Sequence, residues 1–408
     1  MKSSDGNTCD LVVNNARIFD GSAVLEGPHN VGIAGDRIHS VSSSPIAGSR
    51  QIDARGRFLM PGLIDCHIHL LNMWTAKDEA TMAAEIETEL PKRFNDFLNA
   101  GVTTVKSVGD SEDDILSVRA RLASGELAGP RLLVTGAAFA APGSHPATTV
   151  FGQNPWMRYR ATVETDSPEQ AREAVQRLAG KKVDAVKIVH QGGCKHGSPY
   201  FFKVELLRIN VQILKLEKTV LEAIIDEAHR QGLKATVHTV DAEAAIEALE
   251  AGADGLEHGV IEHRLKDDRV VELLLRNRAS YVPTLCLIRL EEKTADVRYA
   301  NLKQVADAGV RVALGTDSFC GLGKFGENAI EEAERSSQAG IGAAQILRMA
   351  TKDAAEHLGV EDLGVVAPGK LADILLLDGD PTTSLGALRK LSMVIQNGTI
   401  VVDNGQIA

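Results

Sequence analysis

Eight short apolar runs alternate with longer helical stretches between Pro61 and Leu358, and this alternation restricts the possible folds more than any other feature. Stretches such as Leu221–Gln231 and Ala242–Ala251 place apolar residues at three- and four-residue steps, as helices with one buried face do. Parallel strands need long crossover connections, usually helices, so the pattern predicts an α/β fold. The apolar runs are Leu63–Leu70, Val102–Val108, Leu132–Thr135, Ala185–His190, Ala235–Thr239, Gly255–His258, Ser280–Val282 and Val310–Gly315.

Eight strands over a segment of this length predict a (β/α)8 TIM barrel. A doubly wound open sheet would give the same alternation, but no glycine fingerprint follows the first strand to favour it. The two ends of the chain instead contain short strands separated by turns, such as the Asn397-Gly398 pair. Asn-Gly predicts a hairpin, because both central positions of that turn need positive φ. We expect residues 1–60 and 359–408 to pair into one small β-sandwich-like module, and residues 61–358 to form the catalytic barrel.

Composition narrows the classes of function. Hydrophobic residues make up 44% of the chain and charged residues 24%, which provides a large core and excludes extensive disorder. The net charge of −11 argues against binding to nucleic acid or to anionic membranes. The longest charge-free run, between Arg131 and Arg158, is broken by glycines and prolines and cannot span a bilayer. Five cysteines without a CxxC pair, and no secretory signal, favour a cytoplasmic enzyme.

Six side chains that can bind metal lie within or directly after these apolar runs: His67, His69, Lys187, His238, His258 and Asp317. Catalytic groups of such a barrel lie at the carboxyl ends of the strands. His67 and His69 are two residues apart, so both imidazoles lie on one face of the strand and can bind one ion. A single strand histidine is more simply a structural residue, but six such residues at one end of different strands favour a metal site. We assign no chemistry to the histidines expected in the terminal module, on loops or on helix surfaces: His29, His39, His196, His229, His263 and His357.

Lys187 requires a separate explanation, because an ammonium group among metal ligands would be repelled. A buried lysine can lose its proton, since desolvation disfavours the charged form. The neutral amine can then react with carbon dioxide to give a carbamate whose two oxygens bridge two ions. The carbamate, Asp317 and a bridging hydroxide would balance most of the charge of two divalent cations, whereas an unmodified lysine would add to it. One metal ion without Lys187 is the alternative arrangement.

Several sequence motifs closely resemble those of the amidohydrolase superfamily: MPGLIDCHIHL, VDAVKIV, KATVHT, GADGLEHG, VALGTDS and LGVVAPGKLADILLLDGDP. The resemblance covers nearly the whole chain and is closest to the imidazolonepropionase-like branch with a binuclear metal centre, which includes metal-dependent prolidases and carboxypeptidases. It implies that His67, His69 and Asp317 bind one metal, that His238 and His258 bind the other, and that a carboxylated Lys187 bridges both. Ring deaminases and true imidazolonepropionases resemble the chain less, because they use one metal and lack this lysine.

We hypothesise that two divalent ions, most simply Zn²⁺, share a hydroxide that attacks an amide or carbamate carbonyl. Metal coordination lowers the pKa of water to roughly 7, which provides the nucleophile at neutral pH. Asp317 would accept the proton and deliver it to the leaving nitrogen. His145, in the sequence APGSHPA, is a candidate for contact with the carbonyl oxygen, with a turn histidine as the alternative.

Ten of the 16 aromatic residues fall in loops expected at the barrel mouth, which predicts a pocket for a bulky apolar group. Packing of these loops on one another, at a subunit contact, is the alternative. The candidate substrate contacts are Trp74, Phe139, Trp156, Tyr200 and Arg289, of which Arg289 would bind a substrate carboxylate. The expected substrate is therefore an N-acyl amino acid or dipeptide-like small molecule. The apolar segment Phe202–Val220 predicts a helix that contacts a partner subunit, and hence a homo-oligomer.

Three other functions stay open. The same binuclear centre can hydrolyse carbamates, lactones or phosphotriesters, and a mononuclear site would indicate a cyclic-amidine deaminase. A catalytically inactive binding protein is disfavoured, because all six ligand-type residues are present. One departure from the prolidase-like pattern is Thr239-Val240, which follows His238 where those enzymes often have an aromatic-glycine pair.

Overall fold

Parallel strands form the main body of the computed structural model, which describes residues 9–192, 213–404 and 406–408. They lie in a seven-stranded sheet, ordered β10-β9-β11-β12-β13-β14-β15, and a three-stranded sheet, ordered β6-β7-β8. All strand pairs in both sheets are parallel, which confirms the α/β class. The bounds are β6 Leu63–Ile68, β7 Val102–Ser107, β8 Arg131–Val134, β9 Ala138–Ala140, β10 Thr162–Glu164, β11 Ala185–Val189, β12 Lys234–His238, β13 Gly255–Glu257, β14 Ser280–Val282 and β15 Arg311–Val312. Each of the eight expected apolar runs contains or overlaps one of these strands.

The short connection from β8 to β9 joins the two sheets. It contains Gly136, whose φ of +66° is one that a residue with a side chain rarely adopts. At the other edge the first strand lies beside the last. The backbone N–H of Cys66 donates to Leu314 O at 2.9 Å, and Ile68 forms a parallel bridge with Ser318. The two sheets are thus joined by the β8–β9 connection at one edge and by these contacts at the other. A closed eight-stranded barrel stays a prediction.

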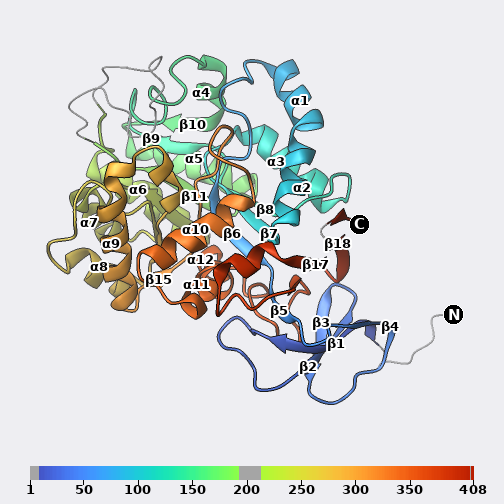
Figure 1. Ribbon diagram of the computed structural model, residues 1–408. Helices are drawn as coiled ribbons and strands as arrows, with labels where there is room; N and C mark the ends of the chain where they lie inside the picture. Colours follow the sequence, from blue (N-terminus) through green and yellow to red (C-terminus); the bar gives the residue numbers. More distant parts are fainter. Residues whose placement is uncertain (1–8, 193–212, 405) are drawn as a thin grey trace.

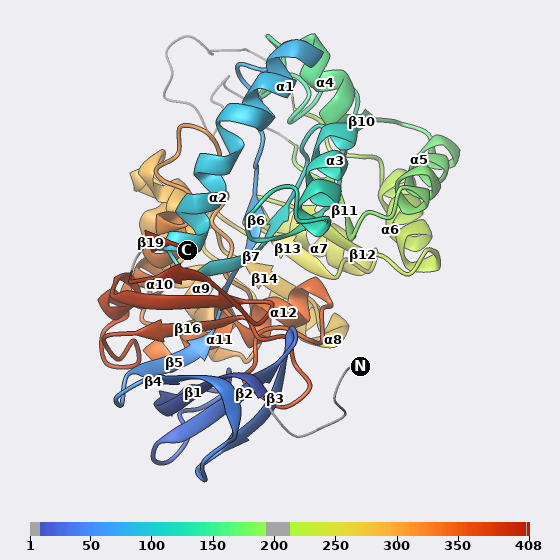
Figure 2. The ribbon, with the colours of Figure 1, turned by 90° about the vertical axis from the view of Figure 1, so that its right-hand side faces the viewer.

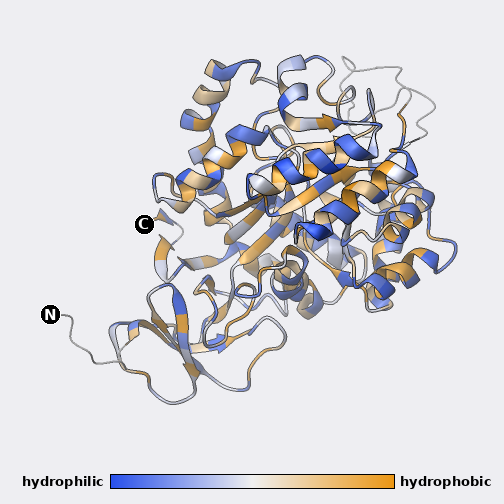
Figure 3. Ribbon diagram, turned by 180° about the vertical axis from the view of Figure 1, so that it is seen from behind, coloured by the Kyte–Doolittle hydropathy of each residue, from blue (hydrophilic) through white to orange (hydrophobic). Residues whose placement is uncertain are grey.

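Helices pack around these strands with their apolar faces inward (Figures 1 and 3). In α6, for example, Leu221, Ile224 and Ile225 are fully buried, whereas Arg230 is exposed. The helices are α1 Glu79–Thr88, α2 Leu90–Asn99, α3 Glu112–Ala123, α4 Pro155–Ala161, α5 Pro168–Gly180, α6 Lys218–Arg230, α7 Ala242–Glu250, α8 Arg269–Asn277, α9 Ala295–Asp307, α10 Glu327–Gln338, α11 Ala343–Met349 and α12 Lys352–Leu358, with 3-10 turns η2 Leu285–Arg289, η3 Glu292–Thr294 and η4 Leu385–Arg389. Among the described helices, none is both long and apolar enough to cross a bilayer.

The helix expected over Phe202–Val220 is only partly described. Its residues up to 212 lie outside the described part of the chain, residues 213–217 are not helical, and α6 begins at Lys218.

The two ends of the chain contribute to one nine-stranded sheet, ordered β19-β18-β17-β16-β5-β1-β2-β3, with β4 paired to β1 (Figure 2). Asn397 and Gly398 have φ of 48° and 74°, which confirms the expected hairpin. The boundary expected after residue 60 falls inside β5, a buried strand that pairs with both β1 and β16. The strands are β1 Cys9–Ile18, β2 His29–Ala34, β3 Arg37–Ser42, β4 Gly48–Asp53, β5 Phe58–Pro61, β16 Ile374–Leu377, β17 Leu391–Gln396, β18 Thr399–Asp403 and β19 Gln406–Ile407.

Candidate active site

The six predicted metal ligands and His145 all line one cavity. His67 lies on β6, Lys187 on β11 and His238 on β12, while His258 and Asp317 follow β13 and β15. Each of these residues lies at or near the carboxyl end of its strand, so the parallel arrangement brings them to one edge of the sheets. Residues separated by up to 250 positions therefore meet, as the sequence analysis predicts.

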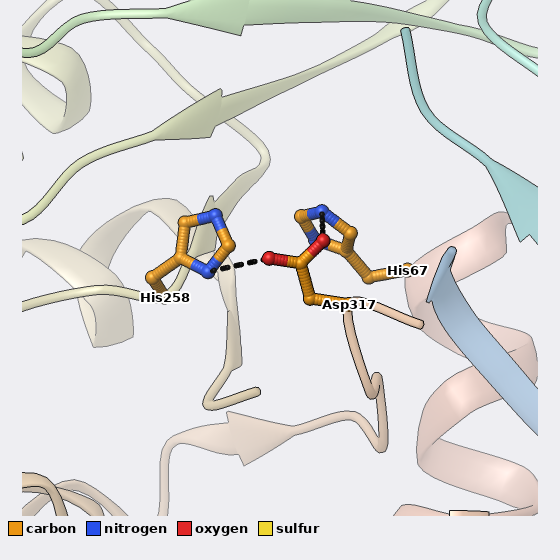
Figure 4. A group of neighbouring side chains, drawn as sticks. All are labelled: His67, His258 and Asp317. Atoms are coloured by element: carbon orange, nitrogen blue, oxygen red, sulfur yellow. Dashed lines mark ion pairs between the residues drawn. The ribbon is translucent and has the colours of Figure 1, made fainter. Parts of the chain in front are cut away.

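The Asp317 carboxylate lies between the rings of His67 and His258 (Figure 4). Its Oδ1 is 3.2 Å from His69 Nε2 and 3.5 Å from His67 Nε2, and its Oδ2 is 4.0 Å from His258 Nδ1. The rings of His238 and His258 have centroids 4.5 Å apart. Ligand atoms of His67, His258 and Asp317 all lie within 4.8 Å of one another, a spacing at which one cation can contact all three.

Two of these residues have unusual backbone conformations. His258 and Asp317 have φ of 66° and 53°, in the left-handed region that side-chain-bearing residues seldom adopt. Backbone hydrogen bonds hold both: His258 N donates to Val282 O at 2.9 Å, and Asp317 N donates to His67 O at 2.8 Å. Such conformations cost about 1–3 kcal/mol each and cluster at functional sites, because the surrounding structure imposes them to orient a side chain.

Burial lowers the pKa of several basic groups of the cavity. The Lys187 side chain is 3% exposed, and burial lowers the pKa of its amine to about 8. Burial, together with the charge of Lys187, lowers the pKa of His67 to about 4 and that of His145 to about 3. These imidazoles are therefore neutral at pH 7 and able to bind a cation through a lone pair.

Two buried nitrogen atoms of the cavity lack the partners that buried polar atoms normally have. Within residues 9–192 and 213–404, neither His67 Nε2 nor Lys187 Nζ has a hydrogen-bond partner. Buried polar atoms without partners are rare, because each costs about 1–3 kcal/mol. The nitrogen and carboxylate donors around them are those that divalent metals such as Zn²⁺ prefer. The residues thus fit the metals that the sequence analysis expects.

Polar residues behind the histidines orient the rings, and the sequence analysis did not identify them. His67 Nδ1 lies 2.6 Å from Glu257 Oε2, His238 Nε2 lies 2.8 Å from Gln191 Oε1, and His258 Nδ1 lies 2.7 Å from Thr284 Oγ1. Glu257 had a detectable signal, since it is a charged residue inside an apolar run, as Lys187 is. Gln191 and Thr284 lie in loops and had none.

His357, expected on a loop or helix surface, is instead 5% exposed. It lies on the inner face of α12, with its Nε2 2.7 Å from Lys106 Nζ. Gly255 of β13 makes this possible, because a Cβ atom there would lie 3.0 Å from His357 Cε1. The absence of a side chain at Gly255 therefore leaves the space that the His357 imidazole occupies.

The expected substrate contacts are only partly brought together. Trp74 lines the cavity with Met73, Phe151 and Phe319, which form an apolar wall. Phe139 does not: it is fully buried in the core, because strand alternation turns its neighbour Ala138 toward the cavity.

Trp156 and Arg289 are not among the described residues that line the cavity. Trp156 lies on α4 with the Arg160 guanidinium 4.8 Å from its ring centroid. Arg289 forms an ion pair with Glu331 and donates to Asn328 Oδ1 at 2.9 Å. Tyr200 lies outside the described residues.

Comparison with known proteins gives consistent matches. The sequence matches the family described as the Amidohydrolase family over residues 58–402. It is 25% identical over 370 residues to the ochratoxinase of Aspergillus niger, covering 82% of this chain and 72% of the relative. It is 24% identical over 433 residues to the imidazolonepropionase of Geobacillus kaustophilus, covering 97% and 92%. A crystal structure of a Xaa-Pro dipeptidase with bound methionine superposes with a TM-score of 0.79 and 25% identity, covering 96% of this chain and 99% of that one.

Proposed function

Since this chain belongs to the amidohydrolase family and is a hydrolase of carbon–nitrogen bonds, we propose that it cleaves the amide bond of a small substrate with a bulky apolar group. The observation that carries this proposal is one cavity in which the neutral imidazoles of His67 and His145, together with Lys187 and Asp317, adjoin an apolar wall. An N-acyl amino acid or a dipeptide-like molecule fits this combination. The closed eight-stranded barrel belongs to the same proposal and is supported by the contacts between β6 and residues 314–318.

Two divalent ions, for which Zn²⁺ suits the donor set, are proposed to bind at the cavity floor. His67, His69 and Asp317 would hold one and His238 and His258 the other, with Lys187 bridging both as its carbamate. The lowered pKa of Lys187 supports this modification, because a larger fraction of the amine is neutral at pH 7 than in an exposed lysine. When bound, such ions polarise a carbonyl and make water a stronger nucleophile.

The residues of the chain supply the proton transfers and the orientation. Asp317 accepts a proton from the attacking water and delivers it to the leaving nitrogen, so that a neutral amine departs. His145 Nδ1 lies 2.6 Å from Thr149 Oγ1, and when Thr149 donates, the proton of His145 resides on Nε2. That N–H can then donate to the carbonyl oxygen as negative charge develops on it. The apolar wall of Met73, Trp74, Phe151 and Phe319 binds the apolar group and excludes water.

A neutral carbamate is a second candidate substrate, and one observation favours it. Arg289, expected to bind a substrate carboxylate, is engaged by Glu331 and Asn328 away from the cavity. Among the described lining residues the remaining cationic group is Lys187, which is assigned to the metals. The described lining thus offers no cation to pair with a substrate carboxylate, and a neutral carbamate, which has no carboxylate, needs none.

The test combines metal analysis with turnover on a substrate panel. We expect two equivalents of metal per chain, a sharp loss of metal in Lys187→Ala, and partial recovery when a short-chain carboxylic acid is added. Lys234→Ala is the matched control, because Lys234 is also a strand lysine. Its Nζ donates to Glu356 O and His357 O, away from the cavity. Hydrolysis of N-acyl amino acids, dipeptides or neutral carbamates supports the proposal. One metal per chain with ammonia release from a heterocycle would refute it.

A further inference from the structure

A fully buried carboxylate lies directly behind the cavity floor. Glu257 of β13 has no exposed surface, yet it has three hydrogen-bond partners on three other strands. Its Oε2 lies 2.6 Å from His67 Nδ1, and its Oε1 accepts from Lys106 Nζ at 3.1 Å and from Thr236 Oγ1 at 2.5 Å. The carboxylate therefore connects β6, β7 and β12 beneath the site.

We infer that Glu257 is a positioning residue that fixes the His67 imidazole as its Nδ1–H tautomer and thereby directs the Nε2 lone pair into the cavity. This inference rests on the proposed function for its consequence, metal binding, but the tautomer itself is a property of the metal-free protein. A neutral imidazole carries one N–H and one lone pair. Because a carboxylate that already accepts from an ammonium and a hydroxyl can only accept, His67 Nδ1 must be the donor.

The orientation of the other ring nitrogen agrees with this assignment. His67 Nε2 lies 3.5 Å from Asp317 Oδ1 and, within the described part of the chain, has no hydrogen-bond partner. The opposite tautomer would place two lone pairs, those of Nδ1 and of the Glu257 carboxylate, against each other at 2.6 Å. Carboxylates behind metal-binding histidines fix the tautomer and raise ligand basicity in this way.

Lys106 explains how a carboxylate can stay ionised in this position. Its side chain is 3% exposed, and its Nζ contacts both Glu257 Oε1 and His357 Nε2, the latter at 2.7 Å. The Lys106–Glu257 pair has no net charge, so the surrounding core does not enclose an uncompensated charge. A buried ion pair adds little stability over apolar residues of similar size. Its presence under the cavity is therefore better explained by the orientation of His67.

The test uses variants that remove the carboxylate without leaving Lys106 unpaired. The double variant Glu257→Leu with Lys106→Met removes both charges, whereas Glu257→Gln keeps one oxygen for Lys106 and Thr236 and turns an NH2 group toward His67 Nδ1. Asp373→Asn is the matched control, because Asp373 is also a buried acid paired with a basic residue, Arg131, but lies on the strand connection before β16. The measurements are long-range ¹H–¹⁵N spectra of the histidine rings in metal-free protein and Zn²⁺ affinity by competition with a chelator. A His67→Asn spectrum identifies the His67 signals.

In wild type and in Asp373→Asn we expect the Nδ1–H tautomer of His67. The double variant should lose this fixed tautomer and bind Zn²⁺ about 10–100-fold more weakly, the usual cost of removing such a partner. Glu257→Gln should instead give the Nε2–H tautomer, because Lys106 and Thr236 hold the single amide oxygen and the NH2 group then donates to His67 Nδ1. An Nε2–H tautomer in wild type, or an unchanged tautomer and affinity in the double variant, would overturn the inference. If wild type binds no Zn²⁺, the proposed function fails, while the ring spectra still decide the role of Glu257.

Discussion

Replacing Lys187 with methionine should stabilise the metal-free protein at neutral pH. Burial lowers the pKa of Lys187 from about 10.5 to about 8, and in the described residues its Nζ has no hydrogen-bond partner. The difference between the two pKa values corresponds to about 3 kcal/mol by which burial of the ammonium form opposes folding. Methionine has a similar length and no charge, so Lys187→Met should raise the free energy of unfolding at pH 7 by up to that amount.

The sign of the pH dependence provides a second check on the same residue. Between pH 8 and 10.5 the unfolded chain keeps the Lys187 proton while the folded chain releases it, so the free energy of unfolding of wild type rises with pH. Lys187→Met should lack this rise, and the two proteins should converge near pH 10.5.

Urea titrations at several pH values, with chelator in CO₂-depleted buffer, measure both effects. Lys218→Met is the control, because the Lys218 side chain is 73% exposed and its variant should follow the wild-type pH dependence. The reasoning is refuted if Lys187→Met is no more stable than wild type at pH 7 and both show the same slope above pH 8.

Three further outcomes are expected. His145→Ala should lower turnover by roughly 10²–10³-fold, the scale of a lost oxyanion donor, without changing metal content; unchanged turnover in kinetic assays would remove His145 from the mechanism. Asn154→Ala should lower the free energy of unfolding by about 1–2 kcal/mol and raise KM for bulky apolar substrates. The reason is that Asn154 caps α4 and donates to Met73 O and Ala76 O, beside Trp74. An unaltered denaturation midpoint and KM would contradict this. Chelation should abolish turnover, and added Zn²⁺ should restore it. Full activity of a protein that metal analysis shows to be metal-free would exclude the proposed centre.

The strands and the ligand positions were accessible from the sequence because both depend on short-range rules. Apolar runs of three to eight residues bounded by helical stretches predict parallel strands, and each of the eight runs contains or overlaps one. The spacing of His67 and His69 and the positions of His238 and Asp317 at strand ends then predict a common site, because parallel strands share one edge. The structure brings these residues to one cavity.

The wrong expectations share a cause, which is that side-chain environment depends on what packs against each residue. Phe139 was expected in a loop over the site but lies in β9 and faces the core. Arg289 was expected to face a substrate but pairs with Glu331 of α10, a helix that begins 38 residues later. His357 was expected at the surface but fills a space left by Gly255, 102 positions earlier in the chain.

The sequence by itself determined the order of the strands and helices along the chain and the candidate metal ligands, because periodicity and residue type are properties of neighbouring positions. Only the tertiary structure decided which groups lie behind those side chains. Glu257, Lys106 and His357 come from β13, β7 and α12, and their contacts exist because separate elements pack together. Burial in that packing, which no local pattern encodes, also lowers the pKa of Lys187 and leaves His67 and His145 neutral at pH 7.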